Sequence, residues 1–470
     1  MNNTPILILQ MQRMGDLILT FPLMGWLQQH VPEHPLWVVS EPRFFQELMD
    51  LAPKAVFFPP EAAERLASTA YHAVINLSHR SDAARLCGAL RTEQRVGPHI
   101  RGQARYIEGF WQLYRASIVH NNRHNHFHWG DLNLLDTVPL NALPTVRHPE
   151  SGTPSAAARG CVGLFVGASE PEKRPEPHFW GALAKQLLRK GIRPLFFGGP
   201  DDRPLAKVAE QVAGVAGCNL CGRFSLTQLA HALRALDLFV TSDTGPMHLA
   251  AWIGTPVLNL SMGPVNAWET GPIAAGHLVL RPTVSCNGCW RCGHSHPPCR
   301  DAFRPGPVAA TIHRLLTERG RVPQTDIPGL ALYRTGRDAL GLYTLHRTDG
   351  KTASPRERLG AFWQAWFLSL YAPDKHSENV SRVLARLAAI APELVPVLRR
   401  ATRALSVDIT RHIRRGGLPL TQDFWRAYPP VLRPLTSYLH LRLQNEEYSA
   451  ACRHAVLDMV AQLIAQFEEI

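Results

Sequence analysis

Residues 240–264 read VTSDTGPMHLAAWIGTPVLNLSMGP, and this stretch predicts a β-α-β unit with a ligand-binding turn. An apolar strand leads into a polar turn, a helix follows over 246–253, and a second strand follows over 256–260. Pro246 suits the first helical turn, where its missing N–H would be unpaired anyway. Gly245 allows backbone amides to approach a ligand closely, and a helix N-terminus attracts anions.

The same turn carries two side chains with chemical potential, the carboxylate of Asp243 and the imidazole of His248. At the C-terminal edge of a parallel sheet, such a turn would hold a phosphorylated or sugar ligand. The structural alternative is that Asp243 or Thr244 caps the helix and that His248 is a half-buried side chain. On this stretch alone, the two interpretations carry equal weight.

Length and composition indicate a multidomain globular protein with anionic partners. The 470 residues exceed one ordinary core, which predicts two or three domains. No apolar run approaches the ~20 residues that span a bilayer, and the chain opens on a strand instead of a signal segment, which favours the cytoplasm. The formal net charge of +12 favours nucleotides, phosphorylated sugars or anionic lipid surfaces as partners. We find no nucleic-acid-binding motif and expect no nucleic-acid partner.

Alternating strands and helices predict two doubly wound α/β units that face each other across a cleft. Residues 1–150 begin with a strand over 6–9 and a helix over 17–29. A segment rich in Pro, Ser, Thr and Ala over 141–159 resembles an interdomain linker. The alternation then restarts and continues over 155–322.

The rest of the chain changes character. Residues 325–350 have the apolar content and central Gly-Arg-Asp of a β-hairpin, and residues 355–470 have the helical periodicity of an accessory domain. Six arginines of this helical domain would face either lipid or acceptor phosphates or the solvent, and we favour the solvent. They are Arg399, Arg400, Arg403, Arg411, Arg414 and Arg415.

A second polar turn follows the first strand of the chain. This strand ends in Gln-Arg-Met-Gly-Asp, in which Gly15 permits close backbone approach and Asp16 lies where ligands bind in open α/β folds. Arg13 would keep Asp16 ionised, and a carboxylate there could accept a proton from an acceptor hydroxyl. The structural alternative is an N-cap aspartate, worth ~1 kcal/mol to its helix.

Four motifs in this order resemble glycosyltransferase family 9, the bacterial ADP-heptose:lipopolysaccharide heptosyltransferases and their relatives. The motifs are RMGDLILTFP at 13–22, KRP at 173–175, GRFSL at 222–226 and SDTGPMHLAAWIGTPVLNLSMGP at 242–264. The resemblance covers about residues 4–320 and does not extend to 325–470. It implies a GT-B architecture of two Rossmann-like domains, with an acceptor domain over 1–150 and a donor-nucleotide domain over 155–322.

The resemblance also assigns roles to individual residues. It implies that Asp16 is the general base and that Lys173, assisted by Arg174, neutralises the donor diphosphate as charge grows on the leaving group. Asp243 would bind the sugar hydroxyls. The turn formed by Thr244, Gly245 and Pro246 would present amides to the phosphates, and His248 matches a family position on the same helix.

Other residues are expected on the acceptor side. Arg13 and Gly15 flank the expected base, and Arg80 follows a strand of the first unit, where it would meet an anionic acceptor or form part of a surface turn. The sequence departs from the family at Arg223, where lysine is common, and it lacks the usual tryptophan after the basic pair at 173–174.

Two segments have a metal-like composition. Cys286, Cys289, Cys292 and Cys299 have spacing that suits zinc or an iron–sulfur cluster, but cysteine-rich loops also occur here in relatives whose chemistry needs no metal, so we favour a reduced loop. The His-rich segment over 120–129 lacks helical His spacing and acidic partners. We interpret it as a flexible loop that faces the acceptor.

The resemblance thus implies an inverting, metal-independent glycosyltransferase that requires no cofactor. The expected donor is a nucleotide sugar, ADP-heptose, and the expected acceptor is the lipopolysaccharide core or another anionic cell-envelope glycan or glycolipid. We expect a cytoplasmic location with peripheral contact at the inner membrane face. The alternatives are a nucleotide-sugar epimerase of the same GT-B build and a non-catalytic binding module.

Overall fold

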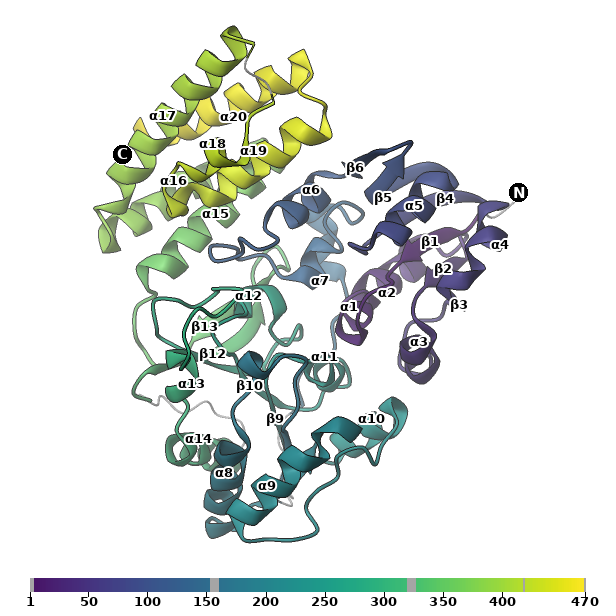
Figure 1. The fold of residues 1–470 in the computed structure, drawn as a ribbon, viewed down its shortest axis with the longest axis vertical. Coiled ribbons are helices and arrows are strands. Elements are labelled where there is room, and N and C mark those ends of the chain that lie inside the picture. Colours follow the sequence, from purple (N-terminus) through teal and green to yellow (C-terminus); the bar gives the residue numbers. More distant parts are fainter. Residues whose placement is uncertain (1–3, 153–159, 319–326, 417–418, 469–470) are drawn as a thin grey trace. The chain divides into compact units, whose positions relative to one another are not determined.

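The computed structural model describes residues 4–152, 160–318, 327–416 and 419–468, and these fall into two compact units. The first unit comprises the described residues of 1–95 and 128–351, and the second comprises those of 96–127 and 352–470 (Figure 1). Both predicted doubly wound regions therefore lie in one unit. Residues 96–127, which the sequence analysis assigned to the N-terminal domain, group instead with the C-terminal helices.

The first sheet of unit 1 is parallel around a central strand. Strand β1 (Ile6–Leu9) lies between β2 (Leu36–Val39) and β4 (Ala70–Asn76), and β3 (Val56–Phe58) pairs with the outer side of β2. All four residues of β1 are buried, as expected for a central strand of a parallel sheet. Because the chain moves outward to β3 and then returns to β4, a topological switch point lies between β1 and β4, where ligands bind in such folds.

The single helix predicted over 17–29 is wrong, since the structure has two helices there. Helix α1 (Met14–Ile18) is short, and α2 (Phe21–His30) starts after a break. Pro22 has no N–H to donate to the carbonyl of Ile18, so the first helix cannot continue through it. The break leaves Asp16 on a helix of its own, directly after β1.

The second sheet of unit 1 has a parallel part and an antiparallel edge. Its order is β13-β12-β11-β10-β9-β7-β8, and the pairs from β8 to β11 are parallel. These strands are β7 (Cys161–Phe165), β8 (Arg193–Phe197), β9 (Leu238–Thr241), β10 (Val257–Leu260) and β11 (Leu278–Pro282). The chain runs from β7 outward to β8 and then crosses to β9, which places a second switch point between β7 and β9.

Strands β12 (Leu330–Arg337) and β13 (Tyr343–Arg347) pair antiparallel at the edge of this sheet, in the region where the hairpin is predicted. Helices cover the parallel part, and one core joins them to the strands, with Trp180 and Phe196 fully buried within it. The helices of this region are α8 (Pro177–Arg189), α9 (Arg203–Ala213), α10 (Leu226–Arg234), α11 (Gly245–Trp252) and α14 (Pro305–Thr317).

The second unit is a helical assembly that includes α6 (Phe110–Ser117) from the middle of the chain. The Tyr114 ring of α6 meets the Phe367 ring at a centroid distance of 4.5 Å, and Phe110 meets Tyr438 at 5.4 Å. The C-terminal helices are α15 (Pro355–Tyr371), α16 (Pro373–Ile390), α17 (Leu394–Arg414), α18 (Gln422–Arg426), α19 (Arg433–Asn445) and α20 (Ala450–Glu468). No helix within the described ranges is both long enough and apolar enough to cross a bilayer.

The His-rich segment over 120–129 is buried, in contrast to the flexible loop that its composition predicts. His124 and His126 are both less than 10% exposed. Asn125 accepts a 3.0 Å hydrogen bond from the hydroxyl of Tyr114 and donates one of 2.8 Å to the carbonyl of Phe127. The burial of these side chains and the hydrogen bonds of Asn125 tie most of the segment into the fold.

Candidate active site

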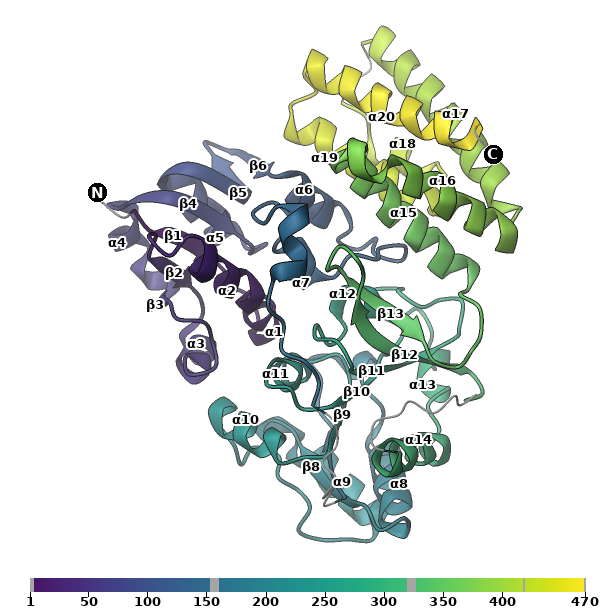
Figure 2. The same cartoon turned by 180° about the vertical axis from the view of Figure 1, so that it is seen from behind.

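The helices that follow the switch-point strands of the two sheets, α1 and α11, lie side by side, as Figure 2 shows. A Cβ atom on Gly15 would lie 3.0 Å from Cδ2 of His248 and 3.6 Å from Cα of Gly245. A Cβ atom on Gly245 would overlap Cε of Met14. The two glycines therefore let the carboxyl ends of both sheets meet at one place.

Asp243 lies in the turn after β9, and only 14% of its side chain is exposed. Its Oδ2 atom accepts a 2.8 Å hydrogen bond from the hydroxyl of Thr270, which is the last residue of α12 (Ala267–Thr270). Burial raises the pKa of Asp243 to about 6, against the opposing effects of the Thr270 hydrogen bond and the Lys173 charge. The charge of Asp16 also acts on Asp243 and raises its pKa further. Three predicted site residues from distant parts of the sequence thus share one electrostatic environment.

Asp16 is half-buried at the third position of α1. Its Oδ2 atom accepts a hydrogen bond of 3.2 Å from the backbone N–H of Arg13. Asp16 is therefore not the N-cap residue, which is Arg13; its carboxylate makes the capping-box contact from the third helical position instead. This contact also fixes the direction of the carboxylate at the end of β1, so the capping and catalytic interpretations are compatible.

The two basic residues after β7 have different surroundings. The Nζ atom of Lys173 lies 3.2 Å from Oε1 of Glu170, and the lysine is close enough to Asp243 to lower the pKa of that carboxyl. The guanidinium of Arg174 lies 3.5 Å from Asp202, whose carboxylate also accepts a 2.8 Å hydrogen bond from the backbone N–H of Gly199. Lys173 thus acts on the Asp243 site, whereas Arg174 ties the loops after β7 and β8 together.

His248 is a buried, neutral side chain beside Asp243. Its Nε2 atom lies 4.0 Å from Oδ1 of Asp243. Burial lowers the pKa of His248 to about 3, and neighbouring His128 lowers it too, so this contact is not an ion pair near neutral pH. Among the described residues, Nδ1 of His248 and Oγ of Ser242 find no hydrogen-bond partner although both are buried. A bound ligand would satisfy such groups, since buried polar atoms are rarely left unpaired.

The turn before α11 leaves the start of that helix uncapped by a side chain. Thr244 is the N-cap residue, but its side chain makes no capping hydrogen bond, and its hydroxyl lies 3.1 Å from that of Thr241 instead. Pro246 occupies the first turn, as expected. Pro246 has no N–H and the Met247 N–H bonds to the Thr244 carbonyl at 3.1 Å, so the Gly245 N–H and the helix dipole are what this end of α11 offers an anionic group.

The predicted acceptor-side arginines both make contacts within the protein. A guanidinium nitrogen of Arg13 lies 3.3 Å from the hydroxyl of Ser169. Arg80 forms ion pairs with Glu41 and Asp82 and donates a 3.0 Å hydrogen bond to the carbonyl of Met11. Arg80 thus holds together loops at the carboxyl end of the first sheet, and its contact with an acceptor stays a prediction.

Sequence reasoning missed two residues that act on Asp243. Thr270 lies in a short polar segment with no recognised motif. Arg281 is 6% exposed on β11, donates a 2.9 Å hydrogen bond to the hydroxyl of Ser261, and lowers the pKa of Asp243 through its charge. The sequence does contain one signal for Arg281, which is a charged residue within the apolar run LVLRP. Such a position suggests a role, because buried arginines are paired or functional.

The cysteine-rich loop packs against the end of the 240–264 segment. Gly288 donates a 2.6 Å backbone hydrogen bond to the carbonyl of Gly263, and Trp290 donates one of 3.1 Å to that of Pro264. Cys299 is buried against Gly263. Burial, and to a smaller extent the neighbouring thiols, raises the pKa of Cys289 and of Cys299. In the described part of the chain, no three His, Cys, Asp or Glu side chains are grouped to hold a metal ion. The loop thus packs against the residues that directly follow β10.

Comparison with known proteins bears on this site directly. The family model described as "Glycosyltransferase family 9 (heptosyltransferase)" matches residues 61–298. The chain is similar to lipooligosaccharide heptosyltransferase 2 of Haemophilus influenzae, with 26% identity over 152 residues, which are 31% of this chain and 44% of that protein. It is also similar to lipopolysaccharide heptosyltransferase 1 of Escherichia coli K12, with 25% identity over 311 residues, or 59% of this chain and 93% of that one. The chain spans less than half the length of the Haemophilus relative.

A solved structure shares the fold. The glycosyltransferase family 9 structure from Veillonella parvula matches with a TM-score of 0.54 and 21% identity, over 68% of this chain and 98% of that one. This likeness confirms the predicted GT-B class of two Rossmann-like sheets. The predicted helical C-terminal extension is present in the structure. Since the family model matches half of the residues and its match includes the turn that holds Asp243, this chain belongs to glycosyltransferase family 9, the heptosyltransferase family.

Proposed function

We propose that this protein is an inverting glycosyltransferase that moves a sugar from a nucleotide-sugar donor to a cell-envelope glycan. The observation that carries the proposal is the shared electrostatic environment of Asp16, Lys173 and Asp243 at the carboxyl ends of both sheets. Family membership supports the reaction class, and the relatives' names suggest heptose as the sugar and the lipopolysaccharide core as the acceptor. ADP-heptose is therefore the first donor to test.

In this proposal, Asp16 acts as the general base. Its carboxylate takes the proton of the acceptor hydroxyl while the hydroxyl oxygen bonds to the anomeric carbon of the donor. The bond from that carbon to the diphosphate oxygen breaks on the opposite face, so the anomeric configuration inverts. The contact with the Arg13 backbone N–H holds the carboxylate in one direction for this step.

The leaving diphosphate gains negative charge as the bond breaks. Lys173 would supply a positive charge, and the uncapped start of α11 would supply the Gly245 N–H and the positive end of the helix dipole, so this chain's own groups would stabilise that charge. Arg174, which is paired with Asp202, would act at longer range by holding the loop that carries Lys173. No metal or other cofactor has a step in this proposal.

The sugar of the donor is assigned to the Asp243 turn. The ionised carboxylate would accept hydrogen bonds from sugar hydroxyls, and the unpartnered Nδ1 of His248 and hydroxyl of Ser242 would gain partners when a ligand binds. The sequence before 150 would then bind the acceptor, and 155–322 would bind the donor. We place the reaction in the cytoplasm, at the inner membrane face, on an anionic glycan or glycolipid.

Replacement of the proposed base tests the mechanism. With ADP-heptose and a lipopolysaccharide core that lacks heptose, Asp16→Ala should lower the rate of ADP release about 10²- to 10⁴-fold. Donor binding, measured as the rise in melting temperature with ADP-heptose, should stay near that of the parent protein. Asp50→Ala removes an exposed carboxylate and is the matched control. Near-parental transfer by Asp16→Ala would refute the assignment of the base.

The same assay separates the alternatives. An epimerase would convert the nucleotide sugar without any acceptor, which nuclear magnetic resonance of the sugar detects. A non-catalytic module would bind a donor but would not convert it, either with the acceptor or without it. A melting-temperature screen with ADP-, GDP- and UDP-sugars identifies the nucleotide, since only the bound donor stabilises the protein in proportion to its concentration relative to Kd.

A further inference from the structure

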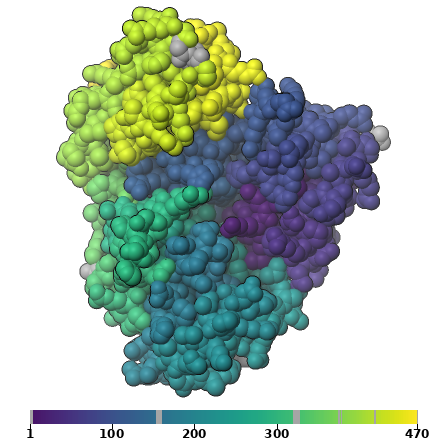
Figure 3. Space-filling view, in the orientation of Figure 1, coloured from purple at the N-terminus to yellow at the C-terminus, as the bar shows by residue number. Residues whose placement is uncertain are grey.

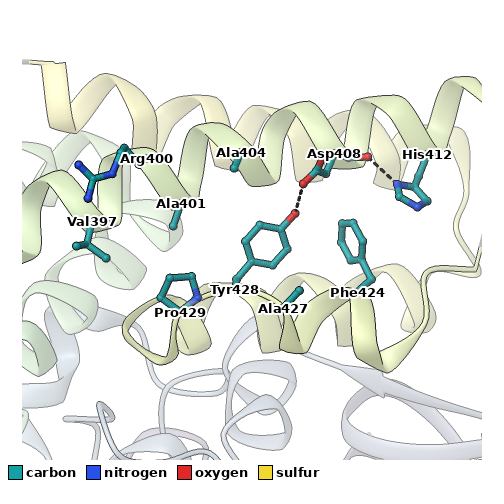
Figure 4. Close-up of a pocket in the computed structure, with 10 residues that line it drawn as sticks. All are labelled: Val397, Arg400, Ala401, Ala404, Asp408, His412, Phe424, Ala427, Tyr428 and Pro429. Atoms are coloured by element: carbon teal, nitrogen blue, oxygen red, sulfur yellow. Dashed lines mark hydrogen bonds between the residues drawn. The ribbon is translucent and has the colours of Figure 1, made fainter.

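A groove runs along α17 in the second unit, with α18 and the residues that follow it on the other side, as Figure 4 shows. Its volume is about 640 Å³. The α17 side chains in it recur every three or four residues, so they share one face of that helix. The lining is mainly apolar and includes Val397, Ala401, Ala404, Phe424, Ala427 and Pro429.

The polar groups at one end of the groove satisfy one another. Asp408 accepts hydrogen bonds of 2.8 Å from the Tyr428 hydroxyl and 2.9 Å from the Arg411 guanidinium. Burial and the Asp408 contact raise the pKa of Tyr428, so its hydroxyl remains a donor. The Nδ1 atom of His412 lies 2.9 Å from the backbone carbonyl of Asp408. This end of the groove therefore carries little unpaired charge.

The other end carries a positive charge that nothing in the described ranges neutralises. Arg400 lies there in Figure 4, is exposed, and makes no hydrogen bond or ion pair with a described residue. A groove with an apolar floor and one cationic end complements an amphiphile with an anionic head. Arginine suits phosphate in particular, because its planar donors can bind two oxygens at once.

The surroundings of the groove extend this positive charge. Helix α17 has five arginines and a single acidic residue, Asp408, and Arg415 follows directly. Arg403 pairs with Glu468 at 2.6 Å, but the exposed Arg399 and Arg414 have no acidic partner within the described residues. Val407, on the same helix, is 56% exposed. Figure 3 shows this yellow-green part of the second unit at the molecular surface.

We propose that this surface of α17 binds anionic membrane lipid, with lipid phosphates on the arginines and part of an acyl chain in the groove. A basic helix with exposed apolar residues lies on a bilayer surface and gains affinity from each arginine near it. The apolar groove favours a lipid over a nucleic acid, because an acyl chain can fill it and a phosphodiester backbone cannot. The proposal stands apart from the transfer reaction and concerns a part of the chain that the family model does not match.

Sedimentation with vesicles tests the proposal on the full chain. The protein should bind vesicles of phosphatidylcholine and phosphatidylglycerol at 3:1, should bind phosphatidylcholine alone far less, and should dissociate as salt is raised. Arg399→Glu with Arg400→Glu should weaken binding at least tenfold. Arg189→Glu with Lys190→Glu, at the exposed end of α8, makes the same change in net charge and should leave binding within about twofold, as expected if the effect depends on location and not on total charge.

A second variant tests the groove without removing any arginine. Ala404→Glu places a carboxylate among the apolar lining and should reduce vesicle binding severalfold, whereas Ala404→Ser should not. Circular dichroism checks that each variant is folded. Parental binding by the folded Arg399→Glu, Arg400→Glu variant would overturn the proposal. The proposal would also be overturned if Ala404→Glu bound vesicles as the parent protein does and the parent protein bound a single-stranded oligonucleotide equally tightly. Together, these two results would indicate a surface that binds any polyanion. Loss of vesicle binding with normal heptose transfer to a soluble acceptor would support the proposal and leave the proposed enzyme function intact.

Discussion

The hydroxyl of Thr270 donates a 2.8 Å hydrogen bond to Oδ2 of Asp243, and this contact links α12 to the turn at the centre of the candidate site. The contact opposes the rise in the pKa of Asp243 that burial causes. Four further charged or titratable groups act on or lie beside this carboxyl: Asp16, Lys173, His248 and Arg281. Thr270 is the neutral donor in this set, so it can be changed without altering the charge of the site.

Thr270→Val should therefore move the acidic limb of the pH–kcat/KM profile to higher pH. Loss of one hydrogen bond to a buried carboxylate corresponds to a rise in its pKa of about one pH unit. At pH 7, less of Asp243 would then be ionised to accept the sugar hydroxyls. Thr270→Ser keeps the hydroxyl and should restore the parental profile. If the valine variant has the same pH profile as the parent protein, the hydrogen bond between Thr270 and Asp243 does not influence sugar binding.

Asp243→Asn should stabilise the protein near pH 8 while it impairs transfer. The pKa of Asp243 is about 6 in the folded state, above its usual value near 4, so the folded protein holds a proton that the unfolded chain releases. The stability contributed by this group is present below pH 4 and is lost as pH rises through 6. The asparagine variant avoids that loss and should gain up to about 3 kcal/mol at pH 8.

Urea midpoints of the Asp243→Asn variant and the parent protein, measured at pH 4 and pH 8, check this expectation. The difference should be small at pH 4 and large at pH 8. A gain of the same size at both pH values would mean that the carboxylate's charge is not what costs stability.

His277→Asn should reduce the sensitivity of the fold to mild acid. Burial lowers the pKa of His277 to about 3, so below pH 6.5 the unfolded chain binds a proton that the folded state excludes. The stability of this group is therefore present above pH 6.5 and is lost as pH falls toward 3. Asparagine keeps an acceptor for the 3.3 Å contact with the Val257 backbone N–H and does not titrate.

The free energy of unfolding of His277→Asn, measured in urea between pH 5 and 6.5, should thus depend on pH less steeply than that of the parent protein. The difference in slope should be up to about 1.4 kcal/mol per pH unit. His231→Asn changes an exposed histidine and should leave the slope as it is in the parent protein. Equal slopes for the two variants would show that His277 is protonated in the folded state.

Gly15→Ala should lower activity more than it lowers stability. The new methyl group would lie 3.0 Å from Cδ2 of His248, so α1 and α11 must separate by a few tenths of an ångström. Such a shift misplaces the proposed base relative to the Asp243 turn, and small misplacements cost about 10²-fold in rate. Gly25→Ala, on α2 with ordinary contacts only, should be neutral or slightly stabilising. Parental kcat in Gly15→Ala would show that the approach of the two turns is not needed for turnover.

Local pattern predicted the framework of this fold well. The short buried apolar run of β1 lies at the predicted residues, 6–9, and the turn before α11 lies at a switch point of the second sheet. Strand β11 was not predicted, since Arg281 interrupts its apolar run, and the hydrogen bond to Ser261 that makes this arginine acceptable is a tertiary contact.

Contacts between distant residues were beyond the reach of such patterns. Nothing in the neighbourhood of Thr270 indicates that its hydroxyl meets Asp243. The residues of 96–127 likewise have the same strand and helix signals as the rest of the first 150 residues. Their grouping with the C-terminal helices depends on aromatic packing of α6 against α15 and α19, which no local periodicity encodes.

The composition of the second unit also sets an order in which the protein can be made. Ile107 donates its backbone N–H to Asn445, 338 residues later, and Asn121 donates to Ser437 across 316 residues. The ribosome synthesises nearly the whole chain before these partners exist. The aromatic side chains of α6 therefore lack their C-terminal packing partners during most of translation. The C-terminal helices are therefore no detachable appendage. A chain truncated after residue 351 would keep α6 but would lack the C-terminal helices against which its aromatic side chains pack.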